Sequence, residues 1–114
     1  MLKELTTIVR TESVAHLVSE LEKLDVTRFW VSHVHALGAG VDPGDYRVSF
    51  EDGGAYSEKA KVEFIVDQET LEAALAVIRD HCATGRRGDG VVVVSDVDTV
   101  VNVRTGDRNR LALL

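Results

Sequence analysis

Residues 59–94, KAKVEFIVDQETLEAALAVIRDHCATGRRGDGVVVV, decide the fold. The run begins with apolar residues at every second position and continues with an apolar stripe of helical spacing. The pattern predicts, in order, a strand over 59–66, a helix over 68–83 capped by Asp67, a glycine-rich loop over 84–90 and a strand over 91–95. This run therefore predicts one strand–helix–strand unit.

The N-terminal part of the chain predicts a similar unit. The expected elements are a strand over 2–10, a helix that Thr11 or Ser13 can cap, with its apolar stripe at Val14, Leu17, Val18, Leu21 and Leu24, and a strand over 28–37. A further strand is expected over 100–104. The order is βαββαβ, so we predict one α+β domain over 1–114 with a ferredoxin-like sandwich fold. Both helices would cover one sheet face, and the open apolar face favours self-association.

A long connection over 38–58 separates the second and third predicted strands. It carries five acidic residues and one basic residue, and no clear core pattern. Residues 45–50 and 54–56 could pair as a hairpin. Loops of this length are usually functional, so we expect partner contacts here, although a merely solubilising surface is the alternative. The candidate contact residues are Asp42, Asp45, Tyr46, Arg47, Glu51 and Asp52.

Composition limits the class of protein. The chain has 114 residues and a formal net charge of −6, which argues against non-specific nucleic-acid binding. No apolar run is long enough to cross a membrane, so a cytoplasmic location is expected. The single cysteine, Cys82, is predicted to be a buried structural thiol. His33 and His35 share a strand face but lack a third ligand, so no metal site is predicted.

The glycine-rich loop over 84–90 has two interpretations when it is considered alone. Its glycines and amides could form a concavity for a phosphate, with two arginines as additional donors. An ordinary connection with a helix C-cap at Gly85 is equally compatible with the residues.

Three motifs in register resemble the PII signal-transduction family from Leu2 to about Asp107. Residues 84–90, TGRRGDG, resemble its B-loop, and residues 103–107, VRTGD, resemble its C-loop. Residues 59–63, KAKVE, enter the strand after a connection as long as the family's mobile T-loop. The resemblance implies a T-loop over 38–58, a B-loop over 84–90, and a C-loop and tail over 104–114.

The resemblance also implies a homotrimer that binds a nucleotide between neighbouring chains. The nucleotide-binding candidates are Glu63, Ile65, Thr84, Gly85, Arg86, Arg87, Gly88, Asp89, Gly90 and Arg104. Lys59 stands where the family holds an oxoacid effector, with Gly38, Ala39 and Gly40 beside it. The T-loop would dock on a membrane transporter or a metabolic enzyme. No catalytic residue, cofactor or membrane insertion is implied.

Several positions depart from the family pattern. Val91 replaces a phosphate-binding lysine, Asn102 and Ala39 replace arginines, Gly40 replaces a glutamine, and Asp52 replaces a tyrosine that some members have uridylylated. Trp30 could stack on a base or fill the pocket. Hydrogen bonds to charged groups contribute about 1.5–3 kcal/mol each. We therefore expect ADP or AMP to be favoured over ATP, although Arg86, Arg87, Arg108 or Arg110 could compensate in part.

Other functions stay open at this point. A PII-like sensor of bicarbonate together with a nucleotide, linked to inorganic-carbon uptake, would use the space left by the missing cations. A small ferredoxin-like enzyme is a further alternative, because fold alone does not fix function. The last alternative is a scaffold trimer that binds no nucleotide.

Overall fold

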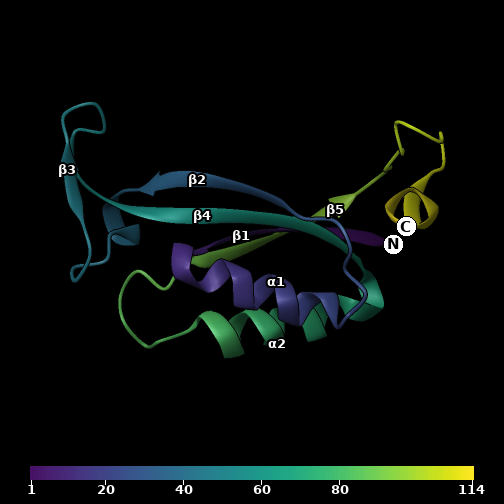
Figure 1. Cartoon of the computed structure of the whole chain (residues 1–114), viewed down its shortest axis with the longest axis horizontal. Coiled ribbons are helices and arrows are strands. Elements are labelled where there is room, and N and C mark those ends of the chain that lie inside the picture. Colours follow the sequence, from purple (N-terminus) through teal and green to yellow (C-terminus); the bar gives the residue numbers. More distant parts are fainter.

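The computed structural model describes all residues, 1–114, as a sheet with two helices on one side (Figure 1). Its main elements are β1 (Leu2–Arg10), α1 (Val14–Glu22), β2 (Trp30–Ala36), β3 (Arg47–Ser49), β4 (Gly54–Asp67), α2 (Leu71–Cys82) and β5 (Val91–Val97). Short 3-10 turns occupy Thr11–Ser13, Gly38–Gly40, Gln68–Thr70 and Asn109–Leu113.

The sheet has the strand order β2-β4-β1-β5, and every neighbouring pair is antiparallel. The two central strands are therefore the first and third of the four main strands along the chain. This order and the helices on one face confirm the ferredoxin-like α+β prediction. The short strand β3 pairs only with β4, outside the main sheet.

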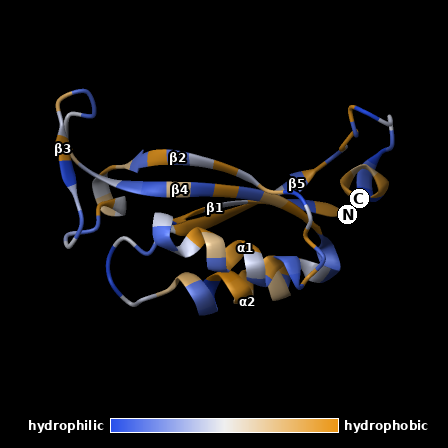
Figure 2. Ribbon diagram, viewed as in Figure 1, coloured by the Kyte–Doolittle hydropathy of each residue, from blue (hydrophilic) through white to orange (hydrophobic).

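The core lies between the sheet and the helices. Alternate residues of β1 and β4 point toward the helical layer, because successive side chains of a strand face opposite ways. The fully buried apolar residues include Leu5, Leu17, Leu21, Val62 and Phe64. Cys82 packs in the same cluster at 6% exposure, which confirms the predicted structural thiol. Figure 2 shows hydrophobic colouring on both helices and on the strands that they cover.

The opposite, outer face of the sheet has no helix over it. Trp30, Val91 and Val93 lie on this face, with side chains more than half exposed. Trp30 is paired in register with Glu63, and Val93 with Thr6. An apolar face of this kind is a surface suited to association with another chain.

The 38–58 connection is more regular than its sequence suggests. The predicted hairpin is confirmed, since Arg47 pairs with Tyr56 and Ser49 with Gly54. The prediction that the third strand begins near Lys59 is wrong, because β4 starts at Gly54 and pairs with both β3 and the end of β2. Its extra residues project the hairpin beyond the sheet (Figure 1).

The strand expected over 100–104 is absent. Only an isolated bridge joins Val101 to Arg108. The Asn102 side-chain oxygen accepts hydrogen bonds from the amides of Arg104 and Thr105 at 3.0 and 3.1 Å, which folds the backbone into a turn. Asparagine competes with strand hydrogen bonding in this way. The valine-rich pattern over 100–104 could not by itself reveal this turn.

The predicted helix caps are also wrong. Neither Ser13 nor Asp67 makes a side-chain capping hydrogen bond, and the Thr11 hydroxyl bonds to the Glu12 carboxylate instead. The Asp67 carboxylate instead accepts from Arg110 at 2.8 Å, which fastens the C-terminal turn to the end of β4. The hydrogen bond to Asp67 raises the pKa of Arg110. Neither helix has the length and hydropathy needed to span a bilayer.

Candidate functional site

Arg10 is the last residue of β1 and points to the outer face at the end of the sheet that carries the 38–58 loop. Its side chain is 6% exposed. The guanidinium donates from Nε and Nη2 to Asp42 Oδ2, at 3.2 and 3.0 Å. Asp42 belongs to the base of the 38–58 loop, so this pair fixes that loop to the sheet.

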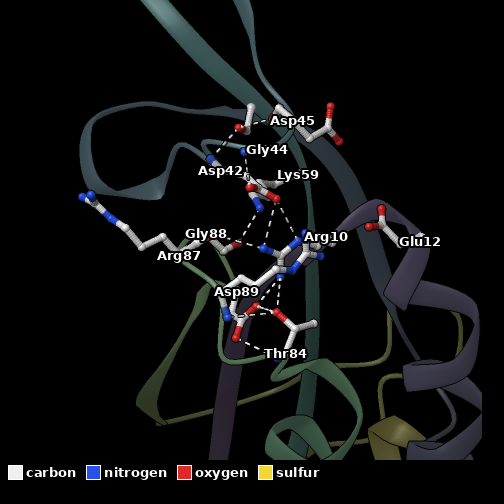
Figure 3. Close-up of polar contacts among 12 residues, drawn as sticks. Arg10, Glu12, Asp42, Gly44, Asp45, Lys59, Thr84, Arg87, Gly88 and Asp89 are labelled. Carbon is white, nitrogen blue, oxygen red and sulfur yellow. Dashed lines mark hydrogen bonds and ion pairs between the residues drawn. The ribbon is translucent and has the colours of Figure 1, made fainter.

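The same guanidinium contacts the glycine-rich loop. Nη2 donates to the Arg87 carbonyl at 3.1 Å, and Nη1 donates to the Thr84 hydroxyl at 3.4 Å and to the Asp89 carboxylate. Figure 3 shows Arg10 between Asp42 on one side and Thr84 with Asp89 on the other. One buried cation therefore connects the two loops.

Asp89 organises the glycine-rich loop from within. Its carboxylate accepts hydrogen bonds from the amides of Thr84 and Gly85 at 2.8 and 2.9 Å, and from the Thr84 hydroxyl. The hydrogen bond from Thr84, followed by that from Arg10, lowers the pKa of Asp89 well below its usual range. The ionised side chain of Asp89 therefore joins the end of the glycine-rich loop to its start at Thr84 and Gly85.

Asp42 organises the base of the 38–58 loop in a similar way. Its Oδ1 accepts from the Gly44 amide at 2.8 Å, and its own amide donates to the Ser57 hydroxyl at 2.8 Å. Ser57 in turn donates to the Asp45 carbonyl at 2.7 Å. The bond from Gly44, with those from Arg10, lowers the pKa of Asp42.

Two glycines allow the loops to come this close. A Cβ on Gly88 would lie 2.9 Å from Asp42 Cβ, and the φ of Gly88 is +92°. A Cβ on Gly90 would lie 1.8 Å from the Ile8 carbonyl oxygen, at φ +113°. Only glycine combines this conformation with such an approach. The two positions therefore require glycine for contact with the 38–58 loop and with β1.

Lys59 lies beside this connection and is 2% exposed. Its ammonium donates to the Gly88 carbonyl and forms no salt bridge. Burial, and then the nearby charge of Arg10, lowers the pKa of Lys59. The predicted effector lysine thus contacts the glycine-rich loop, while Gly38–Gly40 form a 3-10 turn at the end of β2.

The amides at the centre of the glycine-rich loop have no internal acceptor. Those of Arg87 and Gly88 donate no hydrogen bond within the chain. The side chain of Arg87 extends away from the cluster (Figure 3), and Arg86 is exposed. Consecutive free amides next to arginines can accept an anion.

The remaining predicted nucleotide residues lie elsewhere in the chain. Glu63 and Ile65 are on the outer face of β4, and Thr6 donates to Glu63 at 3.4 Å. Arg104 is in the turn over residues 103–105, in the segment that follows β5. This C-terminal segment lies at the end of the sheet opposite the 38–58 loop (Figure 1). Within one chain, these residues are not brought together with the glycine-rich loop.

The predicted partner residues of the 38–58 loop differ in exposure. Tyr46, Arg47 and Glu51 are exposed, and so is Asp45. Asp52 accepts a hydrogen bond from His35, and the His35 ring stacks on Tyr56 with centroids 3.9 Å apart. Asp42 is buried at 4% and therefore belongs to the connection with Arg10 instead of the exposed surface.

Arg10 is the residue that the sequence pattern did not single out. Strand alternation puts it on the same face as Glu4, Thr6 and Ile8, and the register sets it opposite Lys59. The feature of the sequence that could have indicated Arg10 is a basic residue at the end of a strand, followed by turn residues. Its partners come from positions 32 and 79 residues away, and no local pattern reveals them.

The fold and this connection define a ferredoxin-like domain in which two loops share one buried cation. The sequence model of the family described as nitrogen regulatory protein P-II matches residues 2–107. The chain belongs to this family, whose members are signal transducers and not enzymes.

Similar proteins support the assignment. Nitrogen regulatory protein P-II 1 of Methanothermobacter thermautotrophicus is 30% identical over 98% of this chain and 97% of its own length. The PII protein of Arabidopsis thaliana, solved with citrate, is 30% identical, with a TM-score of 0.78 over 97% of this chain and 91% of that one. GlnK of B. subtilis has a TM-score of 0.79 at 24% identity, covers 98% of both chains, and has also been solved with ATP.

Proposed function

We propose that the chain forms a homotrimer that binds an adenine nucleotide between neighbouring chains. The glycine-rich loop of one chain would hold the phosphates, and Glu63, Ile65 and Arg104 of a neighbour would complete the pocket. The observation that carries this proposal is that central amides of the glycine-rich loop donate no hydrogen bond within the chain and lie next to Arg86 and Arg87. The pairing of Arg10 with both Asp42 and Asp89 joins this loop to the 38–58 loop. A ligand that moves the glycine-rich loop would thereby act on the base of the 38–58 loop.

The division of candidate residues between two ends of the sheet supports assembly. Arg104 is separated from the glycine-rich loop in one chain, but a neighbour could supply it across the outer face. The exposed valines and Trp30 on that face provide apolar area for the contact. Sedimentation equilibrium is expected to give three times the chain mass, and a monomer at micromolar concentration would overturn this part.

We expect ADP or AMP to bind in preference to ATP. The cations within the glycine-rich loop that face solvent are Arg86 and Arg87, because Arg10 and Lys59 are buried and bonded to the loop itself. Val91 is apolar, and Arg110 is engaged by Asp67. Asn102 is likewise engaged, since its amide group donates to the Ala112 carbonyl at 3.1 Å. Calorimetric titration with AMP, ADP and ATP tests the preference. Binding of ATP tenfold more tightly than ADP would overturn it, and no heat with any of them would favour a scaffold.

The 38–58 loop would carry the signal to a transporter or metabolic enzyme. Its hairpin projects beyond the sheet and presents Tyr46, Arg47 and Glu51 to solvent. Its formal charge is negative, so a basic docking surface is the complementary partner. Affinity capture of the whole protein with ADP and without nucleotide, repeated after Tyr46→Ala, tests this role, and capture that depends on neither would contradict it.

Bicarbonate sensing is a second candidate that one observation favours. The Lys59 ammonium is buried and has no carboxylate partner, so a small anion could neutralise it. ADP affinity should then depend on bicarbonate and not on 2-oxoglutarate, and Lys59→Met should remove that dependence. An effect of 2-oxoglutarate alone would exclude bicarbonate as the co-effector.

A further inference from the structure

A cluster of two histidines and one glutamate lies on the helical layer, outside the site described above. His16 and Glu20 are on α1, and His81 is in the last turn of α2. His16 Nε2 is 2.9 Å from His81 Nδ1, and His81 Nε2 is 3.8 Å from Glu20 Oε2. One ligand atom from each residue lies within 4.8 Å of the other two.

The helices fix this arrangement. Residues 16 and 20 are four apart, so their side chains share one face of α1. The neighbouring residues Leu17, Leu21 and Ile78 pack in the core and hold α1 against α2. The imidazole rings of His16 and His81 meet edge to face, with centroids 4.5 Å apart and an interplanar angle of 78°. The three donors therefore converge from two packed helices.

The carboxylate of Glu20 is oriented by a fourth residue. Lys23 donates to Oε1 at 2.9 Å, while Oε2 faces His81. Lys23 thus fixes one carboxylate oxygen and leaves the other beside His81, which is how outer residues position metal ligands.

We propose that His16, Glu20 and His81 form a binding site for Zn²⁺. Two imidazole nitrogens and one carboxylate oxygen are ligands that zinc prefers, and a water completes four-coordination. Tetrahedral Zn–N bonds of about 2.0–2.1 Å set two ligand nitrogens roughly 3.3 Å apart. His16 Nε2 and His81 Nδ1 are 2.9 Å apart, so these two atoms would move slightly apart to bind one ion, with loss of the hydrogen bond that they share. The carboxylate of Glu20, which lies beside His81 Nε2, would turn toward the same ion.

The site would join the two helices close to the start of the glycine-rich loop. The helix α2 ends at Cys82, one residue after His81, and the loop begins at Thr84. Cys82 points into the core, so its thiol is not a ligand. The cluster is on the opposite side of the sheet from the outer face, and it therefore remains accessible if the outer faces associate.

Isothermal titration of the full chain, untagged and freed of metal with a chelator, with zinc chloride at neutral pH tests the site. One zinc per chain is expected to bind, and His16→Gln and His81→Gln should each weaken binding by about tenfold or more. His33→Gln removes an exposed histidine on β2 and is the matched control, for which unchanged affinity is expected. Absence of zinc binding, or equal losses in all three variants, would overturn the proposal.

Cobalt substitution gives a readout that does not depend on the variants folding. The metal-free protein with Co²⁺ should show the intense visible absorption of a four-coordinate ion, and zinc should displace it. Absorption of a six-coordinate ion, or none, would overturn the proposal. Glu20→Gln should weaken that absorption, while circular dichroism is used to check that the variant retains its helices.

Discussion

Arg10 and Asp42 are 32 residues apart in sequence and are joined by two hydrogen bonds from one guanidinium. The same guanidinium also pairs with Asp89, so neither carboxylate can move away without changing the surroundings of the other. The link is buried, where charge pairs are screened little by salt. It gives the domain a physical connection between its glycine-rich loop and its projecting hairpin.

The contact between the glycine-rich loop and β1 predicts a large effect of a small substitution. Gly90→Ala would put a methyl group 1.8 Å from the Ile8 carbonyl, in addition to strain at positive φ. We expect a loss of unfolding free energy greater than the roughly 1–3 kcal/mol that such conformational strain costs alone. Urea denaturation measures it.

Gly85→Ala is the matched control for this prediction. Gly85 also has a positive φ, +83°, but a Cβ there would meet no atom within 4 Å. Gly85→Ala should lower the free energy of unfolding by about 1–2 kcal/mol, because only the backbone conformation is strained. Equal losses in the two variants would contradict the close approach to Ile8.

The lowered pKa of Asp89 predicts a dependence of stability on acid. Its folded-state pKa is below the unfolded value of about 4, so the carboxylate contributes stability above that pH. This contribution decreases as the pH falls below about 4 toward the folded-state pKa. The stability difference between the native protein and Asp89→Asn should therefore be constant from neutral pH to about pH 5 and shrink in stronger acid.

Urea denaturation at several pH values measures this difference. Asp45→Asn removes one exposed carboxylate without removing a side-chain hydrogen bond, and serves as the control for net charge. A difference that stays unchanged between neutral pH and strong acid would show that Asp89 does not act through its charge.

Replacement of Val91 by lysine should restore affinity for a triphosphate. Val91 is 62% exposed on the outer face, directly after the glycine-rich loop, so the core would be unaffected. One charged hydrogen bond of about 1.5–3 kcal/mol corresponds to a gain in ATP affinity of about tenfold or more. AMP affinity should change little, because AMP lacks the outer phosphates.

Calorimetry on two variants separates a specific contact from a general change in charge. Val48→Lys adds the same charge on the exposed hairpin strand β3, at 69% exposure. It should leave ATP affinity within a factor of about two, the effect of weak surface charges. Equal gains in both variants would argue against a phosphate contact at position 91.

Trp30 should report assembly through its fluorescence. It is the single tryptophan, and it is 52% exposed on the face proposed to meet a neighbouring chain. Burial at that contact would shift its emission to shorter wavelength, and dilution should shift it back toward that of an exposed indole. Emission independent of concentration, measured while sedimentation shows dissociation, would place Trp30 outside the contact.

The sequence predicted those elements whose periodicity is local. Alternation over 59–66 identified the buried face of β4, and the stripe through Leu17 and Leu21 identified α1. The pattern over 100–104 misled because valines favour strands, whereas the side chain of Asn102 decides the turn. Residues 54–58 carry no alternation, so the true start of β4 depends on pairing with β3.

Only part of the candidate site could be predicted from the sequence. Glycine spacing identified the loop over 84–90, because positive φ requires particular residues. The roles of Arg10 and Asp42 depend on contacts between segments distant in the chain, and so does the meeting of His16 with His81. The i, i+4 spacing of His16 and Glu20 was visible, but the third ligand came from the other helix.

Hydrogen–deuterium exchange of the whole protein with and without ADP tests the coupling of the two loops most directly. We predict that ADP slows exchange of the Gly88 and Asp89 amides and also changes exchange over residues 42–57, which Asp42 and Ser57 hold together. Exchange over 42–57 that stays the same while the glycine-rich loop becomes protected would contradict the account.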